Sequence, residues 1–198
     1  MAIAPREHML PVLILYATRE GQTRRIAEHL AAAIRAADWG ADALDVRELP
    51  GDFDLGKYSA AVLAASIHLG KHEREMIAFV RERRSALEAM PAAFLSISLS
   101  EAGAEMETNA HDVRLQAARD VQRLIDEFFE QTGWHPARVK PVAGALAYTK
   151  YNALVRLVMK HIAKKEGGST DTHHDHEYTD WVALDQFVVE FLSAVKNN

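Results

Sequence analysis

The chain has 198 residues, of which 48% are hydrophobic and 26% are charged, and its formal net charge is -5. This composition excludes fibrous and disordered proteins, and no stretch reaches the roughly 18 apolar residues that span a bilayer. The absence of cysteine excludes disulfide scaffolds, thiolate metal sites and cysteine nucleophiles. The acidic balance gives no general attraction for nucleic acid. We therefore expect one cytoplasmic domain, residues 1–198, with no nucleic-acid partner.

Short apolar runs alternate with longer amphipathic segments along the chain. Residues 12–17 form a continuous apolar run, which is typical of a strand buried on both faces. Apolar side chains that recur at helical spacing then predict a helix, which we expect Gly40 to close as a left-handed cap. The same two patterns predict further strands at 60–66, 92–99 and 139–146, and further helices at 76–87, 113–128 (followed by Gly133) and 181–195. Residues 43–49 alternate with period two, which predicts an edge or near-edge strand.

Five strands alternating with helices predict an α/β fold with a parallel sheet covered on both faces. Right-handed crossovers make this a doubly wound arrangement. One segment breaks the rhythm, because residues 148–178 separate the fifth strand from the last helix. Connections in such folds are usually about 2–6 residues long, so this insertion before the last helix is expected to be functional.

A glycine-containing turn lies directly between the first strand and the first helix. Such a turn presents free N–H groups and the positive end of the helix dipole to an anion, which suits a phosphate group. The segment lacks the second glycine and the lysine of a P-loop, and it is not GxGxxG, so a nicotinamide dinucleotide is disfavoured. The alternative is a simple helix cap by Thr18 or Thr23. The residues of this turn are Thr18, Arg19, Glu20, Gly21, Gln22 and Thr23.

The turns after the third and fourth strands are expected beside this phosphate loop. In open parallel sheets, ligands bind at the carboxyl ends of the strands where the strand order reverses. The turn that begins at Ser66 and the turn that begins at Ser96 would then meet at one rim, and three such loops suit a flat mononucleotide such as FMN.

Motifs along almost the whole chain resemble those of flavodoxins. Within them, the sequence is similar to the flavodoxin-type, quinone-dependent protoporphyrinogen dehydrogenases of haem biosynthesis. The insertion motif and the Tyr-Thr-Asp-Trp motif after it are the most specific to that family. The matching stretches are Tyr16-Ala-Thr-Arg-Glu-Gly-Gln-Thr23, Ala65-Ser-Ile-His-Leu-Gly70, Met90-Pro-Ala-Ala-Phe94, Gly144-Ala-Leu146, Gly167-Gly-Ser-Thr-Asp-Thr172 and Tyr178-Thr-Asp-Trp181.

The resemblance implies a flavodoxin-like five-stranded sheet in the order 2-1-3-4-5 and an FMN-dependent oxidoreductase. This enzyme would oxidise protoporphyrinogen IX to protoporphyrin IX and pass the electrons to menaquinone or ubiquinone. The phosphate loop would hold FMN, and the flavin contacts would come from Ser66, Ile67, His68, Leu69 and Gly70 after the third strand, and from Ser96, Ile97, Ser98 and Leu99 after the fourth. The alternatives are a flavodoxin that shuttles electrons between proteins and an NAD(P)H:quinone reductase.

Two features of the insertion allow more than one interpretation. Residues Tyr148 to Lys165 form a basic amphipathic pattern, which predicts either docking on the cytoplasmic face of the inner membrane or packing at the sheet edge. The run His173-His-Asp-His176 contains metal-ligand residue types, but adjacent ligands in a polar loop favour a solvated loop, so no metal is predicted. His68 should lie near the cofactor, and its role stays open.

Overall fold

The computed structural model describes residues 10–146, 171 and 173–197. Its main sheet contains five parallel strands, and a further strand of two residues pairs with the end of the central one. The sheet order β2-β1-β3-β5-β6 confirms the predicted order 2-1-3-4-5, because β5 and β6 are the fourth and fifth parallel strands. The strands are β1 (Val12–Ala17), β2 (Ala41–Asp45), β3 (Ala60–His68), β4 (Lys71–His72, antiparallel to the end of β3), β5 (Ala92–Ser98) and β6 (Arg138–Ala143).

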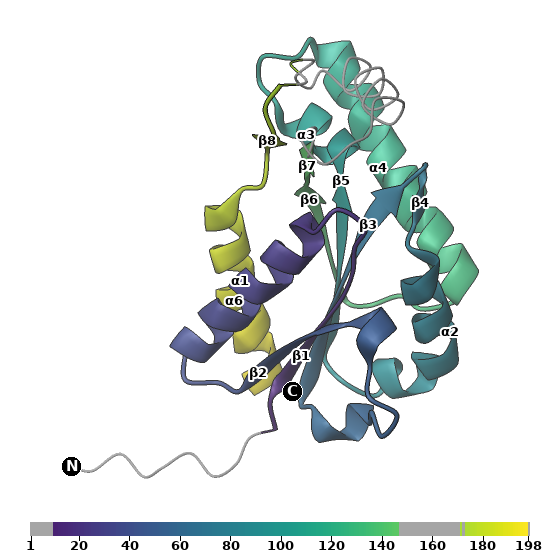
Figure 1. Cartoon of the computed structure of the whole chain (residues 1–198), viewed down its shortest axis with the longest axis vertical. Coiled ribbons are helices and arrows are strands. Elements are labelled where there is room, and N and C mark those ends of the chain that lie inside the picture. Colours follow the sequence, from purple (N-terminus) through teal and green to yellow (C-terminus); the bar gives the residue numbers. More distant parts are fainter. Residues whose placement is uncertain (1–9, 147–170, 172, 198) are drawn as a thin grey trace, which may run out of the picture.

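Helices cover both faces of this sheet (Figure 1). On one face lie α1 (Gln22–Ala36) and α6 (Trp181–Lys196), and on the other lie α2 (Arg74–Glu88) and α4 (His111–Thr132). The shorter elements are the 3₁₀-helices η1 (Val46–Glu48) and η2 (Leu55–Lys57) and the helix α3 (Leu99–Glu105).

Strand β1 shows why the continuous apolar runs become central strands. Val12, Ile14 and Tyr16 pack into the core under α1 and α6, and Leu13 and Leu15 pack into the core under α2 and α4. Successive strand residues point to opposite faces, so a strand with a core on each side needs an apolar residue at every position. The prediction for residues 12–17 is therefore confirmed at each of its residues.

Two local predictions around α1 and β2 were wrong. The helix ends at Ala36, and the residue in the left-handed conformation is Asp38 (φ 62°) rather than Gly40. Gly40 instead allows a close approach, because a Cβ there would lie 3.0 Å from the Cβ of Pro11. The strand predicted at 43–49 ends at Asp45, whose carboxylate accepts a hydrogen bond from the N–H of Arg47 and starts η1.

The chain also departs from the predicted fifth strand at Gly144. Strand β6 stops at Ala143, and Ala145–Leu146 forms a separate strand, β7, that pairs antiparallel with β8 (His176–Glu177). The two ends of the predicted insertion are therefore joined as a ribbon. Most of that insertion, including Tyr148–Lys165, lies outside the described residues.

Candidate functional site

A cavity of about 300 Å³ lies at the carboxyl ends of β1, β3 and β5. This is the position at which open parallel sheets bind ligands. All the predicted site residues line it except Gly21 and Ser96. The lining residues are Thr18, Arg19, Glu20, Gln22, Thr23, Ser66, Ile67, His68, Leu69, Gly70, Ile97, Ser98, Leu99, Ser100, Asp120, Arg123, Leu124, Gly144 and Ala145.

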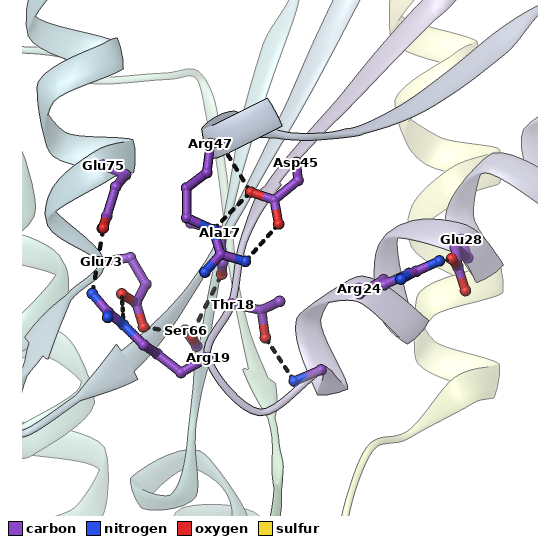
Figure 2. Close-up of polar contacts among 11 residues, drawn as sticks. Ala17, Thr18, Arg19, Arg24, Glu28, Asp45, Arg47, Ser66, Glu73 and Glu75 are labelled. Atoms are coloured by element: carbon purple, nitrogen blue, oxygen red, sulfur yellow. Dashed lines mark hydrogen bonds and ion pairs between the residues drawn. The ribbon is translucent and has the colours of Figure 1, made fainter. Parts of the chain in front are cut away.

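The loop between β1 and α1 has the geometry of an anion site. Gly21 is the N-cap of α1 and has a φ of 97°, a conformation that glycine adopts readily. Its N–H donates a hydrogen bond of 3.0 Å to Oγ1 of Thr18 (Figure 2). The N-cap is Gly21 rather than Thr18 or Thr23, and of these two hydroxyls only that of Thr18 accepts a backbone N–H among the described residues. The N–H groups of the first helical turn have no partner within the helix.

Thr23 gives independent support for a phosphate ligand. Its side chain is fully buried, and among the described residues its Oγ1 has no hydrogen-bond partner. A buried hydroxyl without a partner is costly in a finished protein interior, so such a group calls for an explanation. A phosphate group at the N-terminus of α1 would supply the missing partner.

The guanidinium group of Arg19 contacts two acidic side chains. Its Nε donates a hydrogen bond of 2.8 Å to Glu73, and one terminal nitrogen lies 3.4 Å from Glu75 (Figure 2). The hydrogen bond to Glu73 raises the pKa of Arg19 above its usual value. Ser66 donates a hydrogen bond of 3.3 Å to the same carboxylate. The side chain of Arg19 therefore joins the loop after β1 to the next loop, and its contact with a cofactor stays a prediction.

That next loop is a tight hairpin formed by the end of β3 and β4. Leu69 and Gly70 make the turn with φ values of 50° and 74°, and a turn with two positive φ angles matches the right-handed twist of a hairpin. Leucine is strained in this conformation, yet Leu69 is 80% exposed. The hairpin places the apolar side chains of Ile67 and Leu69 at the cavity.

Ser96 was predicted at the cofactor, but its side chain lies beneath the hairpin. It is buried, and its Oγ is 2.9 Å from Nε2 of His72, which is also buried. Burial lowers the pKa of His72 to about 3. The sequence gives no signal for this pair, because β4 has only two residues and no strand pattern.

The residues that form the third wall of the cavity were not predicted from the sequence. Asp120, Arg123 and Leu124 from α4 line it, together with Gly144 and Ala145. The charged pattern of Arg123 and Glu127, whose side chains pair at 2.6 Å, resembles an ordinary solvated helix face.

The sequence contains a capping signal at the start of α3, although no helix was predicted there. Ser98 is the N-cap of α3 and accepts a hydrogen bond from the N–H of Glu101, as in a Ser-x-x-Glu capping box. Burial, with the nearby Glu105 carboxylate, raises the pKa of Glu101 to about 7.

The His173–His176 run surrounds the side chain and carbonyl of Asp171. The N–H of His173 donates to the Asp171 carboxylate, and Nδ1 of His174 lies 3.0 Å from it. Within the described ranges, no group of three or more histidine and acidic side chains is placed to hold a metal ion. In the same part of the chain, no helix is both long enough and apolar enough to cross a bilayer.

Comparisons with known proteins agree with this geometry. Residues 13–173 match the family model described as a flavodoxin domain. The chain is 32% identical over 181 residues to protoporphyrinogen IX dehydrogenase [quinone] of Escherichia coli K12, which covers 91% of this chain and 94% of the relative. The relative of the same name from Leishmania major is 31% identical over 182 residues, covering 91% of this chain and 74% of the relative.

Solved structures support the fold alone. A short-chain flavodoxin associated with a bacterial microcompartment aligns with a TM-score of 0.53 at 13% identity, covering 94% of this chain and 99% of that one. A flavodoxin from Pseudomonas aeruginosa aligns with a TM-score of 0.51 at 13% identity and the same coverage. A flavodoxin domain implies flavin binding. The chain therefore belongs to the flavodoxin-domain family, as a homologue of the quinone-dependent protoporphyrinogen IX dehydrogenases.

Proposed function

We propose that this chain binds FMN in the cavity and oxidises protoporphyrinogen IX to protoporphyrin IX in haem biosynthesis, with menaquinone or ubiquinone as electron acceptor. The observation that carries the proposal is a phosphate-type loop with a buried Thr23 hydroxyl that has no partner among the described residues, in a chain related over 91% of its length to an enzyme named for this reaction. The reaction itself rests on that relationship, and the geometry supports the cofactor.

The residues at the cavity fit the two ends of FMN. The phosphate group would take N–H groups of the first turn of α1 and the Thr23 hydroxyl, because both donate toward an anion. The flavin ring would lie between the β3–β4 hairpin and the start of α3, where Ile67, Leu69 and Leu99 supply apolar surface. Bound FMN would accept electrons from the substrate and pass them to the quinone, while the protein holds and orients both reactants.

Arg123 on α4 suits the proposed substrate. Its side chain is 55% exposed at the cavity wall, and its partners Asp120 and Glu127 lie on the same helix. An arginine can bind a carboxylate through two parallel hydrogen bonds. Protoporphyrinogen IX carries propionate groups, and one of them would take the place of Asp120 or Glu127 as the partner of Arg123.

The proposal includes peripheral contact with a membrane. A long-chain quinone is dissolved in the bilayer, so the enzyme must reach the membrane surface. The basic amphipathic pattern at Tyr148–Lys165 supports that contact, although this segment lies outside the described residues.

Anaerobic turnover tests the proposal directly. Purified protein loaded with FMN should oxidise protoporphyrinogen IX when a quinone is supplied, and protein stripped of flavin should not. A flavin-loaded protein that leaves porphyrinogen untouched but exchanges electrons with redox proteins would be a shuttle flavodoxin. Reduction of quinone by NAD(P)H without porphyrinogen would instead support the reductase alternative.

A further inference from the structure

The C-terminal end of the insertion is hydrogen-bonded to the phosphate loop. The amide nitrogen of Gln22 donates to Oε1 of Glu177 at 2.7 Å and to Oγ1 of Thr179 at 2.8 Å. Gln22 is the first residue of α1, and the two acceptors are more than 150 residues later in the sequence. Both amide hydrogens of Gln22 are used, so its side chain has no donor left for a phosphate group.

Thr179 extends this contact to the main sheet. It is largely buried, and its hydroxyl donates a hydrogen bond of 2.8 Å to the carbonyl of Ala143, the last residue of β6. The N–H of Tyr178 donates to the carbonyl of Gly144. The segment that carries Glu177 and Thr179 is therefore fixed to the end of β6, and from there it holds Gln22.

Arg25 completes the network from the next turn of α1. It lies 3.0 Å from Oε1 of Glu177 and also donates to the side-chain oxygen of Gln22 at 3.1 Å. Its guanidinium group lies 5.6 Å from the ring centre of Trp181. Every polar group of the Gln22 side chain thus has a partner in this network.

We propose that Glu177 and Thr179 are positioning residues for the phosphate loop. By holding the side chain of Gln22, they fix the backbone N–H groups next to Gly21 before the cofactor arrives. A loop that is already ordered loses less conformational entropy when it binds, so the affinity for the phosphate end of the ligand rises. This inference rests on the proposed binding of FMN.

The charge of Glu177 makes the inference sharply testable. A carboxylate near the phosphate loop repels a phosphate dianion, so its charge alone would weaken FMN binding. Its hydrogen bond to Gln22 acts in the opposite direction, by ordering the loop. Glu177→Ala removes both effects, and Glu177→Gln removes the charge while keeping an acceptor for Gln22.

The experiment measures the dissociation constants of FMN and of riboflavin, which lacks the phosphate, by quenching of flavin fluorescence on the apoprotein. We expect Glu177→Ala and Thr179→Val to weaken FMN binding about 5–10-fold, as for the loss of one hydrogen bond, and to leave riboflavin binding unchanged. Glu177→Gln and Thr179→Ser should bind FMN as wild type or more tightly. Asp185→Ala is the matched control, because it removes the 2.8 Å contact with His29 that joins α1 to α6 away from the loop.

Three results would overturn the inference. FMN binding by Glu177→Ala that equals or exceeds wild type would show that the charge outweighs any positioning. Equal losses of FMN and riboflavin affinity, or an equal loss of FMN affinity in Asp185→Ala, would show that the contacts of Gln22 stabilise the fold in general and do not position the loop. Melting of each apoprotein verifies folding, and Glu177→Ala remains informative if Thr179→Val does not fold, because the Glu177 side chain is 35% exposed. Failure of wild type to bind any flavin would instead refute the proposed function.

Discussion

Arg19 donates a hydrogen bond of 2.8 Å to Glu73, and this contact joins the loop after β1 to the start of α2. The two partners are unequal, since the side chain of Glu73 is 3% exposed and that of Arg19 is 42% exposed. Removing Arg19 leaves a buried carboxylate without its cation, whereas removing the charge of Glu73 leaves an arginine that water can solvate.

We therefore expect Arg19→Ala to lower the melting temperature more than Glu73→Gln, which should lower it by about 2–4 °C. The double variant Arg19→Ala/Glu73→Gln should be more stable than Arg19→Ala alone, because no buried charge remains. Thermal unfolding of the apoproteins measures this order. Equal losses in the two single variants would contradict the argument.

Thr23 should matter for FMN binding and not for folding. Thr23→Val keeps the shape of the side chain and removes a buried hydroxyl that has no partner among the described residues. The unfolding free energy of the apoprotein should stay within about 0.5 kcal/mol of wild type or rise. FMN affinity should fall about 10-fold or more, as for a hydrogen bond to a charged group. Isothermal titration measures the affinity, Thr23→Ser is the matched control, and unchanged FMN affinity in Thr23→Val would argue against a phosphate at this hydroxyl.

We expect that Leu69 lowers the stability of the protein and provides an apolar contact with the ligand. Leu69→Asn creates an Asn-Gly turn, the preferred sequence for two positive φ angles, and should raise the melting temperature by about 2–4 °C. The same change should lower turnover of protoporphyrinogen, because an apolar side chain at the cavity is lost. Leu69→Met keeps the apolar surface and should retain turnover without the gain in stability. Full turnover by Leu69→Asn would show that this side chain is not needed at the site.

His72 should make the protein less stable in mild acid. Its pKa in the folded protein is about 3 because it is buried, against 6.5 ordinarily. Between these values the unfolded chain binds a proton that the folded protein does not, so stability falls as the pH drops below about 6.5. From pH 7 to pH 5 this costs about 2 kcal/mol.

His72→Gln should remove that share of the pH dependence, which urea unfolding at pH 7 and pH 5 can measure. The raised pKa of Glu101 acts in the opposite direction over the same range, because the folded protein then binds the extra proton. It is common to both proteins and cancels when they are compared. Identical pH dependence in wild type and variant would mean that His72 has the same pKa in the folded and the unfolded protein.

The membrane proposal predicts binding to anionic vesicles. Arg156, Lys160 and Lys164 should each contribute about 1 kcal/mol near an anionic surface, so changing all three to glutamate should abolish flotation with such vesicles. High salt should have the same effect on wild type. FMN binding and turnover with a water-soluble quinone should persist. Equal flotation of the two proteins, or none by either, would refute membrane docking by this segment.

The sequence could predict the fold because its core strands carry apolar residues on both faces. The position of the glycine turn that we propose as the phosphate loop was also predictable, since a turn directly after β1 can lie only at the carboxyl edge of the sheet. The direction of the Arg19 side chain could not be predicted, because it depends on Glu73, which is 54 residues away. The place of Arg123 in the cavity wall depends on how α4 is rotated about its axis against the sheet, and packing sets that rotation.

Short elements account for the remaining differences. Strands β4, β7 and β8 have two residues each, too few to show an alternating pattern. A turn beginning at Ser66 was predicted but a hairpin was not, because the turn carries leucine where asparagine or glycine is usual. The helix α1 ends at Ala36, and the residue in the left-handed conformation after it is Asp38, although a glycine stands two residues later.

Leu146 pairs with His176, so the residues that precede the insertion lie next to residues near its end. Paired residues of neighbouring strands lie only about 5 Å apart, so residues can be gained or lost between them without moving any strand of the main sheet. Loop-closure entropy grows only slowly with length, by about 0.6 kcal/mol for each doubling. This junction is therefore a place where an electron-transfer fold can acquire or shed a functional segment during evolution. It is equally a place where an engineered segment could be grafted onto the same flavin-binding core.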